Sequence, residues 1–137
     1  MVYLVCTDRD RKGSLALRKY WRDQGIDVEL PAFEGDAAAL RDAHHKLLTA
    51  CDVVVVFYGA GDEAWKRSTD AELKKLRSLR AERGGLAAYT VLAEPRTGDK
   101  DDILEMNLPN VIDSLSGFDA AALAPLLAAL RPSRVRP

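Results

Sequence analysis

The sequence predicts an α/β domain in which a parallel sheet carries helices on both faces. Short apolar segments alternate with helix-like segments about every 25 residues, as in repeated strand–helix–strand units. The segment 52–58 has no polar alternation, which is typical of a central strand buried on both faces. The chain of 137 residues is 47% hydrophobic and 30% charged, so one domain can form its core without disulfides or a structural metal.

The first half of the chain is expected to contain two strand–helix pairs. Gly25 and Pro31 end the first helix and the second strand, because glycine terminates helices and proline lacks the N–H that a strand needs. Asp36 is the predicted N-cap of an Ala- and Leu-rich helix. The expected elements are a strand at 2–6, a charged turn at 7–13, a helix at 14–24, a strand at 26–30 and a helix that ends near 50.

The second half continues the alternation from the central strand. Gly59 and Gly61 break this strand, and Asp62 and Glu63 favour a helix N-terminus because acidic groups stabilise that end. Pro125 predicts a kink or a late start in the last helix. The expected elements are a strand at 52–58, a helix from 62 to about 83 stopped by Gly84 and Gly85, a strand at 86–92, a polar loop at 94–102, a short strand at 111–112 and a helix at 119–130.

These elements favour a flavodoxin-like, doubly wound sheet of five parallel strands in the order 2-1-3-4-5. In such sheets ligands bind beyond the carboxyl ends of the strands at the point where the strand order reverses, here the first and third strands. We therefore expect functional residues at 7–11 and 58–65. Residues 1–131 form the domain in this interpretation, and the polar, proline-flanked tail 132–137 is interpreted as a linker to a further module.

Charge and hydropathy exclude several classes of function. The formal net charge is −1 and no long run of like charge occurs, which argues against a nucleic-acid partner or an anionic membrane surface. The longest apolar stretch, 53–57, is far shorter than the roughly 18 residues of a spanning helix, and no signal pattern precedes it, so a soluble cytoplasmic protein is expected. Cys6 and Cys51 adjoin apolar segments and are expected to be reduced core thiols. No cluster with metal-ligand spacing occurs, so no metal is expected.

Three nucleotide- or phosphate-related folds of this type fit the motifs poorly. The segment 59–64 matches G-x-G-x-x-A, but Asp62 and Glu63 would repel a pyrophosphate and the fingerprint belongs after a first strand. A phosphoacceptor receiver domain needs an aspartate at the end of the third strand, where this chain has aromatic residues. A flavodoxin would hold the FMN phosphate in a Ser/Thr/Gly loop, whereas residues 8–11 alternate Asp and Arg.

The third helix carries one unusual carboxylate. At 100° per residue, Glu72 falls on a stripe with Trp65 and Thr69, while Asp70 and Glu63 fall on the opposite side. The stripe continues through Leu73, Leu76 and Leu79. An inward-facing Glu72 would either pair with a neighbouring Arg or Lys or belong to a functional site, and both interpretations stay open.

The second helix carries two adjacent histidines. His44 falls on the apolar face of this helix and is expected to be hydrogen-bonded in the core, while His45 lies outside.

Four segments together resemble a TIR domain (Toll/interleukin-1 receptor type) in a bacterial version. They are 2–8, 30–36, 51–58 and the helix from Trp65 to Leu73. The resemblance covers nearly the whole chain in element order and implies the fold given above. It also implies that the loop after the second strand is an assembly and gating loop, whose residues are Phe33, Glu34, Gly35 and Asp36. Phe33 is either an exposed interface residue or a packing anchor under its own loop.

Many prokaryotic members of this family, and some from animals and plants, cleave the nicotinamide–ribose bond of NAD⁺ with a glutamate on the third helix. That glutamate usually follows the helix tryptophan by four residues, where this chain has Thr69; Glu72 comes one turn later, about 5 Å along the axis. The resemblance implies that Glu72 would stabilise the oxocarbenium-like transition state. The residues expected to border the substrate are Thr7, Asp8, Arg9, Tyr58, Gly59 and Trp65, with Trp65 or Phe33 as a stacking face.

Two functions therefore stay open. One is an enzyme that takes NAD⁺ as its substrate and needs no cofactor. The other is a non-catalytic adaptor that acts through homotypic TIR–TIR contacts and transmits assembly to or from a fused or associated sensor or effector module. Thr69 favours the adaptor and the inward-facing Glu72 favours the enzyme.

Overall fold

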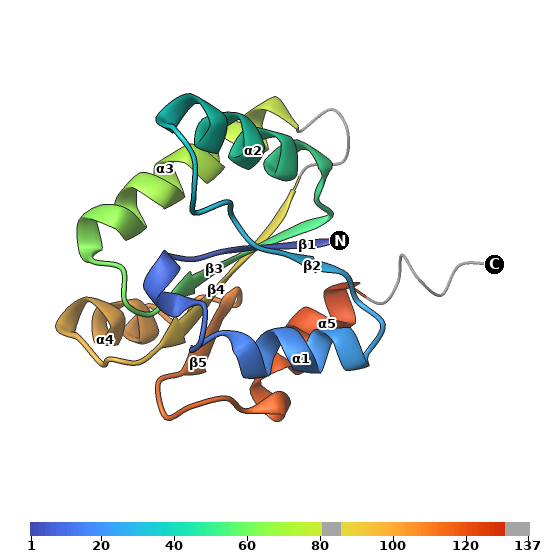
Figure 1. Ribbon diagram of the computed structural model, residues 1–137. Coiled ribbons are helices and arrows are strands. Elements are labelled where there is room, and N and C mark those ends of the chain that lie inside the picture. The colour runs from blue at the N-terminus through green and yellow to red at the C-terminus, as the bar shows by residue number, and fades with distance from the viewer. Residues whose placement is uncertain (81–85, 131–137) are drawn as a thin grey trace.

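The computed structural model describes residues 1–80 and 86–130 and contains a five-stranded, wholly parallel sheet in the order β2-β1-β3-β4-β5 (Figure 1). This is the fold class and strand order that the sequence predicts. The strands are β1 (Val2–Val5), β2 (Val28–Glu29), β3 (Val53–Tyr58), β4 (Ala87–Ala93) and β5 (Val111–Ser114).

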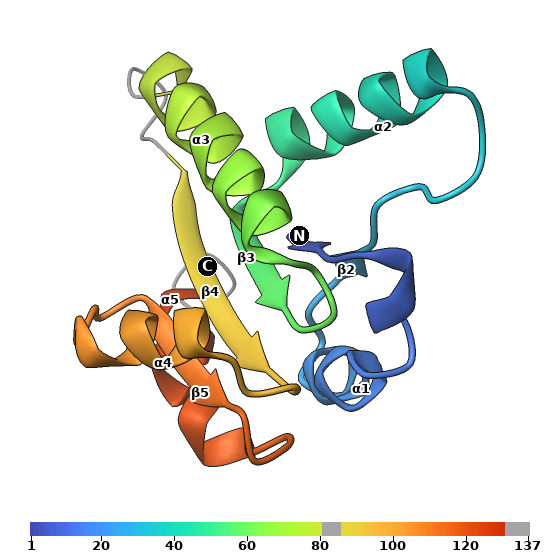
Figure 2. The same cartoon turned by 90° about the vertical axis from the view of Figure 1, so that its left-hand side faces the viewer.

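Helices cover both faces of the sheet, with α1 and α5 on one face and α2 and α3 on the other (Figure 1). Helix α4 lies beside β5 (Figure 2). The α-helices are α1 (Leu15–Asp23), α2 (Ala37–Ala50), α3 (Glu63–Leu79), α4 (Gly98–Glu105) and α5 (Ala124–Leu130), and short 3-10 helices occupy η1 (Asp8–Asp10) and η3 (Ala120–Leu123). None of the helices in the described ranges is both long and apolar enough to cross a membrane.

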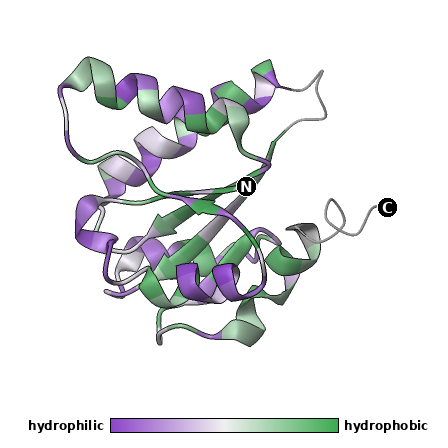
Figure 3. Cartoon of the chain, turned by 45° about the vertical axis from the view of Figure 1, so that its right-hand side comes forward, coloured by the Kyte–Doolittle hydropathy of each residue, from purple (hydrophilic) through white to green (hydrophobic). Residues whose placement is uncertain are grey.

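The central strand β3 is buried along its whole length, as its uninterrupted apolar sequence predicts. Val54 and Val55 have no solvent-exposed surface, and they face opposite sides of the sheet. Val55 packs in a core with Leu17 of α1, whereas Val54 packs in a second core with Leu73 of α3. Apolar residues accordingly dominate the central strands, which are largely green in Figure 3.

Side-chain caps fix the start of both helices that cover the β1–β3 region. The Asp36 carboxylate accepts a hydrogen bond of 2.8 Å from the Ala39 N–H, as the sequence predicts for an N-cap. The Asp62 carboxylate does the same for the Trp65 N–H, also at 2.8 Å. These caps set where α2 and α3 begin, and so where their side chains face each other.

Two elements differ from the sequence prediction. The expected polar loop at 94–102 contains the start of α4, whose N-cap is Thr97; the polar composition conceals the helix because its fully buried inner residue is Lys100. The expected strand at 26–30 shortens to β2, because the Ile26 N–H donates to the last turn of α1, at Trp21 O, instead of to a strand.

The sequence also predicts where the last helix starts and where the third helix ends. The last helix starts late, as predicted: η3 precedes α5, which begins at Ala124, immediately before Pro125. Helix α3 ends at Leu79, and the predicted stop at 84–85 lies outside the described residues. The tail 132–137, interpreted from sequence as a linker, also lies outside them.

Candidate functional site

A cleft of about 420 Å³ opens at the carboxyl end of β1, on the face covered by α2 and α3. Thr7 and Asp8 border it from the segment after β1, and Phe33 borders it from the loop before α2. Trp65 and Glu72 border it from α3. The structure thus brings together four of the residues predicted for substrate and catalysis with one from the predicted assembly loop.

Glu72 ends a chain of hydrogen bonds that joins three elements. Its Oε1 lies 2.6 Å from Nε2 of His44 on α2, and Nδ1 of the same ring lies 2.5 Å from the hydroxyl of Tyr3 on β1. Tyr3 is completely buried, and His44 is partly buried against the Tyr3 ring. His44 is therefore the hydrogen-bonded histidine that the sequence predicts, and its neighbour His45 is exposed.

Burial raises the pKa of the Tyr3 hydroxyl above its ordinary value of 10.0, and the nearby charge of Glu72 raises it further. The phenol therefore keeps its proton at neutral pH. It can therefore donate a hydrogen bond to Nδ1 of His44.

The prediction that Glu72 faces inward with the leucines is wrong. Its side chain is 51% exposed, whereas Thr69 one turn earlier and Leu73 are buried. The carboxylate lies at the edge of the stripe because His44 on the adjacent helix supplies a polar partner there. The sequence left a pairing with Arg or Lys open, and the structure shows a pair with histidine instead. Leu79, at the end of the same stripe, is also exposed.

The segment after β1 is held by a buried carboxylate that the sequence interpretation did not single out. Asp10 accepts a hydrogen bond of 3.0 Å from the Thr7 hydroxyl and one of 2.9 Å from the Ala60 N–H. A Cβ atom at Gly59 would lie 2.5 Å from the Asp10 carboxylate, so Gly59 is required by this close approach. In the sequence, Gly59 indicated a break after the central strand, but not that Asp10 packs against it.

Three residues predicted to border the substrate lie outside the cleft. Arg9 turns toward the loop after β3 and donates a hydrogen bond of 3.0 Å to Ala60 O. The Gly59 carbonyl accepts a hydrogen bond of 2.8 Å from the Lys100 ammonium group. Tyr58 is buried, and its hydroxyl donates a hydrogen bond of 2.7 Å to Asp99 on α4. Burial is the main reason that the pKa of Tyr58 is raised, with Asp99 adding to the shift.

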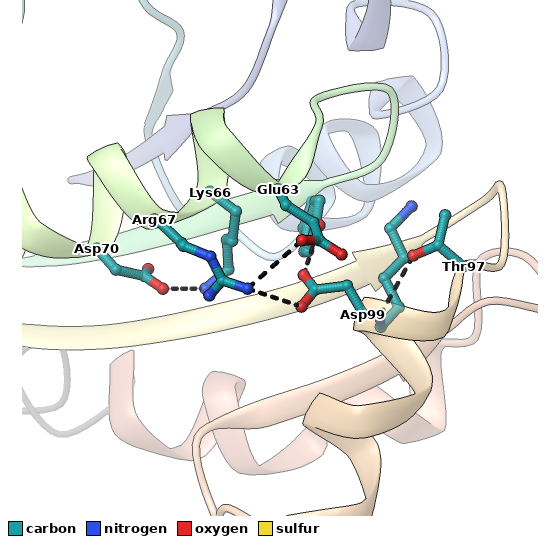
Figure 4. Close-up of polar contacts among 8 residues, drawn as sticks. Glu63, Lys66, Arg67, Asp70, Thr97 and Asp99 are labelled. Carbon is teal, nitrogen blue, oxygen red and sulfur yellow. Dashed lines mark hydrogen bonds and ion pairs between the residues drawn. The ribbon is translucent and has the colours of Figure 1, made fainter.

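Charged side chains link α3 to α4 beside this buried tyrosine (Figure 4). The Arg67 guanidinium lies between Glu63, at 3.5 Å, and Asp99, at 3.6 Å. Lys66 pairs with Asp70 one turn along α3. These paired charges lie on a different side of α3 from the cleft that Glu72 borders.

The loop before α2 is partly packed. Phe33 is half-buried, contacts the core on the α1 face and lies under the Arg11 guanidinium, 5.6 Å from the ring centre. The following residues, Glu34, Gly35 and Asp36, are exposed. The aromatic ring is therefore partly packed against the core, and the residues that follow it are the exposed part of the loop.

The two cysteines are free and buried, in agreement with the sequence prediction. Cys6 lies at the cleft, where burial raises the pKa of its thiol to about 12 and Asp10 adds to the shift. A thiol with this pKa is a poor nucleophile at neutral pH. Within residues 1–80 and 86–130, no group of three or more His, Cys, Asp or Glu side chains could hold a metal ion.

Comparison with known proteins identifies the fold. No protein-family model matches the chain, and no curated protein sequence matches it. Among solved structures, the crystal structure of the RPS4 and RRS1 TIR domain heterodimer is similar, with a TM-score of 0.64 over 97% of this chain and 96% of that chain, at 15% sequence identity. The chain therefore has a TIR-like fold, in agreement with the resemblance seen in the sequence.

Proposed function

We propose that this domain is the catalytic TIR-like module of a cytoplasmic bacterial signalling or antiviral defence protein, and that it hydrolyses NAD⁺ at the nicotinamide–ribose bond. The observation that carries the proposal is the position of Glu72. Its carboxylate borders an open cleft at the carboxyl end of β1, which Trp65 and Thr7 also line. Ligands bind at this end of the strands in doubly wound sheets.

The chemistry needs a fixed negative charge beside the ribose. When the bond between C1′ and the nicotinamide nitrogen breaks, its electron pair leaves with nicotinamide and positive charge develops on the ribose. The Glu72 carboxylate stabilises this charge, water adds to C1′, and one proton passes to solvent. The products are nicotinamide and ADP-ribose.

The residues around Glu72 provide surfaces for the rest of a dinucleotide. Trp65 and Phe33 offer aromatic faces for stacking, and Thr7 and Asp8 offer polar atoms for hydroxyl groups. Arg41 of α2 also borders the cleft and can pair with the pyrophosphate. Arg9, Tyr58 and Gly59 receive no substrate contact in this arrangement, because they lie outside the cleft.

The test is nicotinamide release from NAD⁺ at high protein concentration, because the adaptor alternative and the enzyme both involve self-association. Replacing Glu72 by Gln keeps the size of the side chain but removes its charge, so turnover should fall at least about a hundredfold with little change in folding. The matched control is Glu63→Gln on the same helix, an exposed carboxylate outside the cleft, which should keep its activity. Full activity of Glu72→Gln would contradict the proposal.

The second candidate is a non-catalytic adaptor that acts through TIR–TIR contacts with a fused or associated module. Thr69 stands where the resemblance expects the glutamate, and the similar solved structure is described as a TIR domain heterodimer. Self-association without any nicotinamide release, over the same range of protein concentration, would favour the adaptor.

A further inference from the structure

The hydrogen-bonded chain that runs from Tyr3 through His44 to Glu72 leads from the core to the surface. Tyr3 belongs to the sheet and is fully buried, the His44 side chain is 24% exposed, and the Glu72 side chain is 51% exposed. The most buried member is therefore linked to the most exposed one through a single imidazole ring. We propose that His44, with its tautomer fixed by Tyr3, is the positioning residue that holds the Glu72 carboxylate toward the cleft, an inference that rests on the proposed function.

The tautomer follows from which groups carry protons. An ionised carboxylate only accepts hydrogen bonds, so the Nε2 atom that faces Glu72 must carry a proton. A neutral imidazole then has a bare Nδ1, which must accept a hydrogen bond. The Tyr3 hydroxyl faces Nδ1 at 2.5 Å and retains its proton, so it supplies that donor. The Glu72 carboxylate and the Tyr3 hydroxyl therefore both favour the same tautomer of His44, with the proton on Nε2.

The contact fixes one carboxylate oxygen and leaves the other available. Glu72 has several rotatable bonds and stands half-exposed on a helix surface, where it would otherwise adopt many rotamers. His44 binds Oε1, and within the described part of the chain no group donates to Oε2. A single hydrogen bond from the imidazole N–H orients the carboxylate and leaves its second oxygen free to face a developing cation.

The other polar groups of the cleft do not replace His44. The remaining ionisable side chains that border it are Cys6, Asp8 and Arg41. Neither Cys6 nor Asp8 is a suitable donor to a carboxylate, since Asp8 carries like charge and the Cys6 thiol donates weakly. No contact joins Arg41 to Glu72 among the described residues. The Ser68 and Thr69 hydroxyls also border the cleft, but among the described residues neither forms a hydrogen bond with Glu72. Loss of His44 should therefore remove the contact that holds the carboxylate in its present position.

The first experiment tests positioning without using activity. In ¹⁵N NMR spectra, His44 should show the Nε2–H tautomer in the unmodified domain, and this preference should weaken in Tyr3→Phe, where only Glu72 still selects it. The ¹³C relaxation of the Glu72 side chain should report increased mobility in His44→Ala but not in His45→Ala, which removes the exposed neighbour on the same helix. An Nδ1–H tautomer, or unchanged Glu72 mobility in His44→Ala, would overturn the inference whether or not the domain is an enzyme.

The second experiment measures nicotinamide release. His44→Ala should lower kcat by about tenfold to a hundredfold, the range expected for a hydrogen bond to a charged group, with KM changed less than about threefold. His44→Gln, whose amide can donate in place of Nε2, should recover part of kcat. If His44→Ala leaves Tyr3 unpaired and unstable, the double variant Tyr3→Phe/His44→Ala removes the orphaned hydroxyl and should show the same loss of kcat.

The two experiments distinguish failure of the proposed function from failure of the inference about His44. No nicotinamide release from the unmodified domain refutes the proposed function, while the NMR result still decides whether His44 holds Glu72. Activity that depends on Glu72 but not on His44 upholds the proposed function and overturns this inference.

Discussion

The ammonium group of Lys100 donates a hydrogen bond of 2.8 Å to the backbone carbonyl of Gly59, 41 residues earlier in the chain. The same group also donates to Ala93 O and Pro95 O, at 2.8 and 2.6 Å. One buried lysine thus joins α4 to the carboxyl ends of β3 and β4. Burial lowers the pKa of this lysine, and the three carbonyl groups are the partners that make a buried amine tolerable.

Replacing Lys100 by Met should lower the free energy of unfolding by about 3 kcal/mol or more. Methionine keeps much of the side-chain volume, but it leaves the three carbonyl groups without their donor, and each buried unpaired group costs about 1–3 kcal/mol. Denaturant unfolding measures the change, and Lys12→Met, at an exposed position, is the control. Equal stability of the two variants would show that water replaces the lysine at these carbonyls.

The free energy of unfolding should fall as the pH rises from about 9 to about 12, in part because of Cys6. The ordinary thiol pKa of 9.0 applies to the unfolded chain, whereas in the folded state it is raised to about 12. The stabilising contribution is therefore fully present below pH 9, where both states are protonated, and is lost as the pH rises through this window. Buried tyrosines act in the same direction, so the comparison must isolate one thiol.

The variant Cys6→Ala provides that comparison. It should unfold more easily at neutral pH because it leaves a cavity, but its stability should decline less steeply above pH 9 than that of the unmodified domain. Chemical denaturation at several pH values measures both slopes. Parallel slopes would contradict the assignment of the shift to Cys6.

Much of the fold could be predicted because its signals are local. The uninterrupted apolar segment gave β3, and Asp36 gave the start of α2, since a buried strand and an N-cap depend on residues close in sequence. Helix α4 was missed because its inner face carries Lys100, whose partners come from two other strand ends. A helix that buries a charged residue leaves no apolar periodicity to detect.

The candidate site was only partly predictable for the same reason. Periodicity identified Glu72 and His44 separately, each from its own helix. It could not show that they meet, because their contact depends on how α2 and α3 are placed on the same face of the sheet and on a tyrosine from β1. The burial of Asp10 likewise depends on the loop after β3, which lies 50 residues away.

Phe33→Ala should lower the free energy of unfolding by about 1–2 kcal/mol, less than for a fully buried phenylalanine, because the ring is half-buried against the core. Thermal or denaturant unfolding measures the loss. The exposed neighbour Glu34 is the matched comparison: Glu34→Ala should stay within about 0.5 kcal/mol of the unmodified domain. If Phe33→Ala reduces self-association in sedimentation experiments while its stability is unchanged, the ring is an interface residue instead of an anchor.

The departure at Thr69 can be tested by moving the carboxylate back by one turn. In the double variant Thr69→Glu/Glu72→Gln, the new carboxylate would start from a buried position nearer Trp65 and would lack its contact with His44. Because the positioned charge is what stabilises the developing cation, nicotinamide release should stay within about tenfold of the Glu72→Gln level. Circular dichroism confirms that the variant is folded before its activity is compared. Recovery of the unmodified rate would show that the catalytic position is the fourth residue after Trp65 and that the pairing with His44 is dispensable.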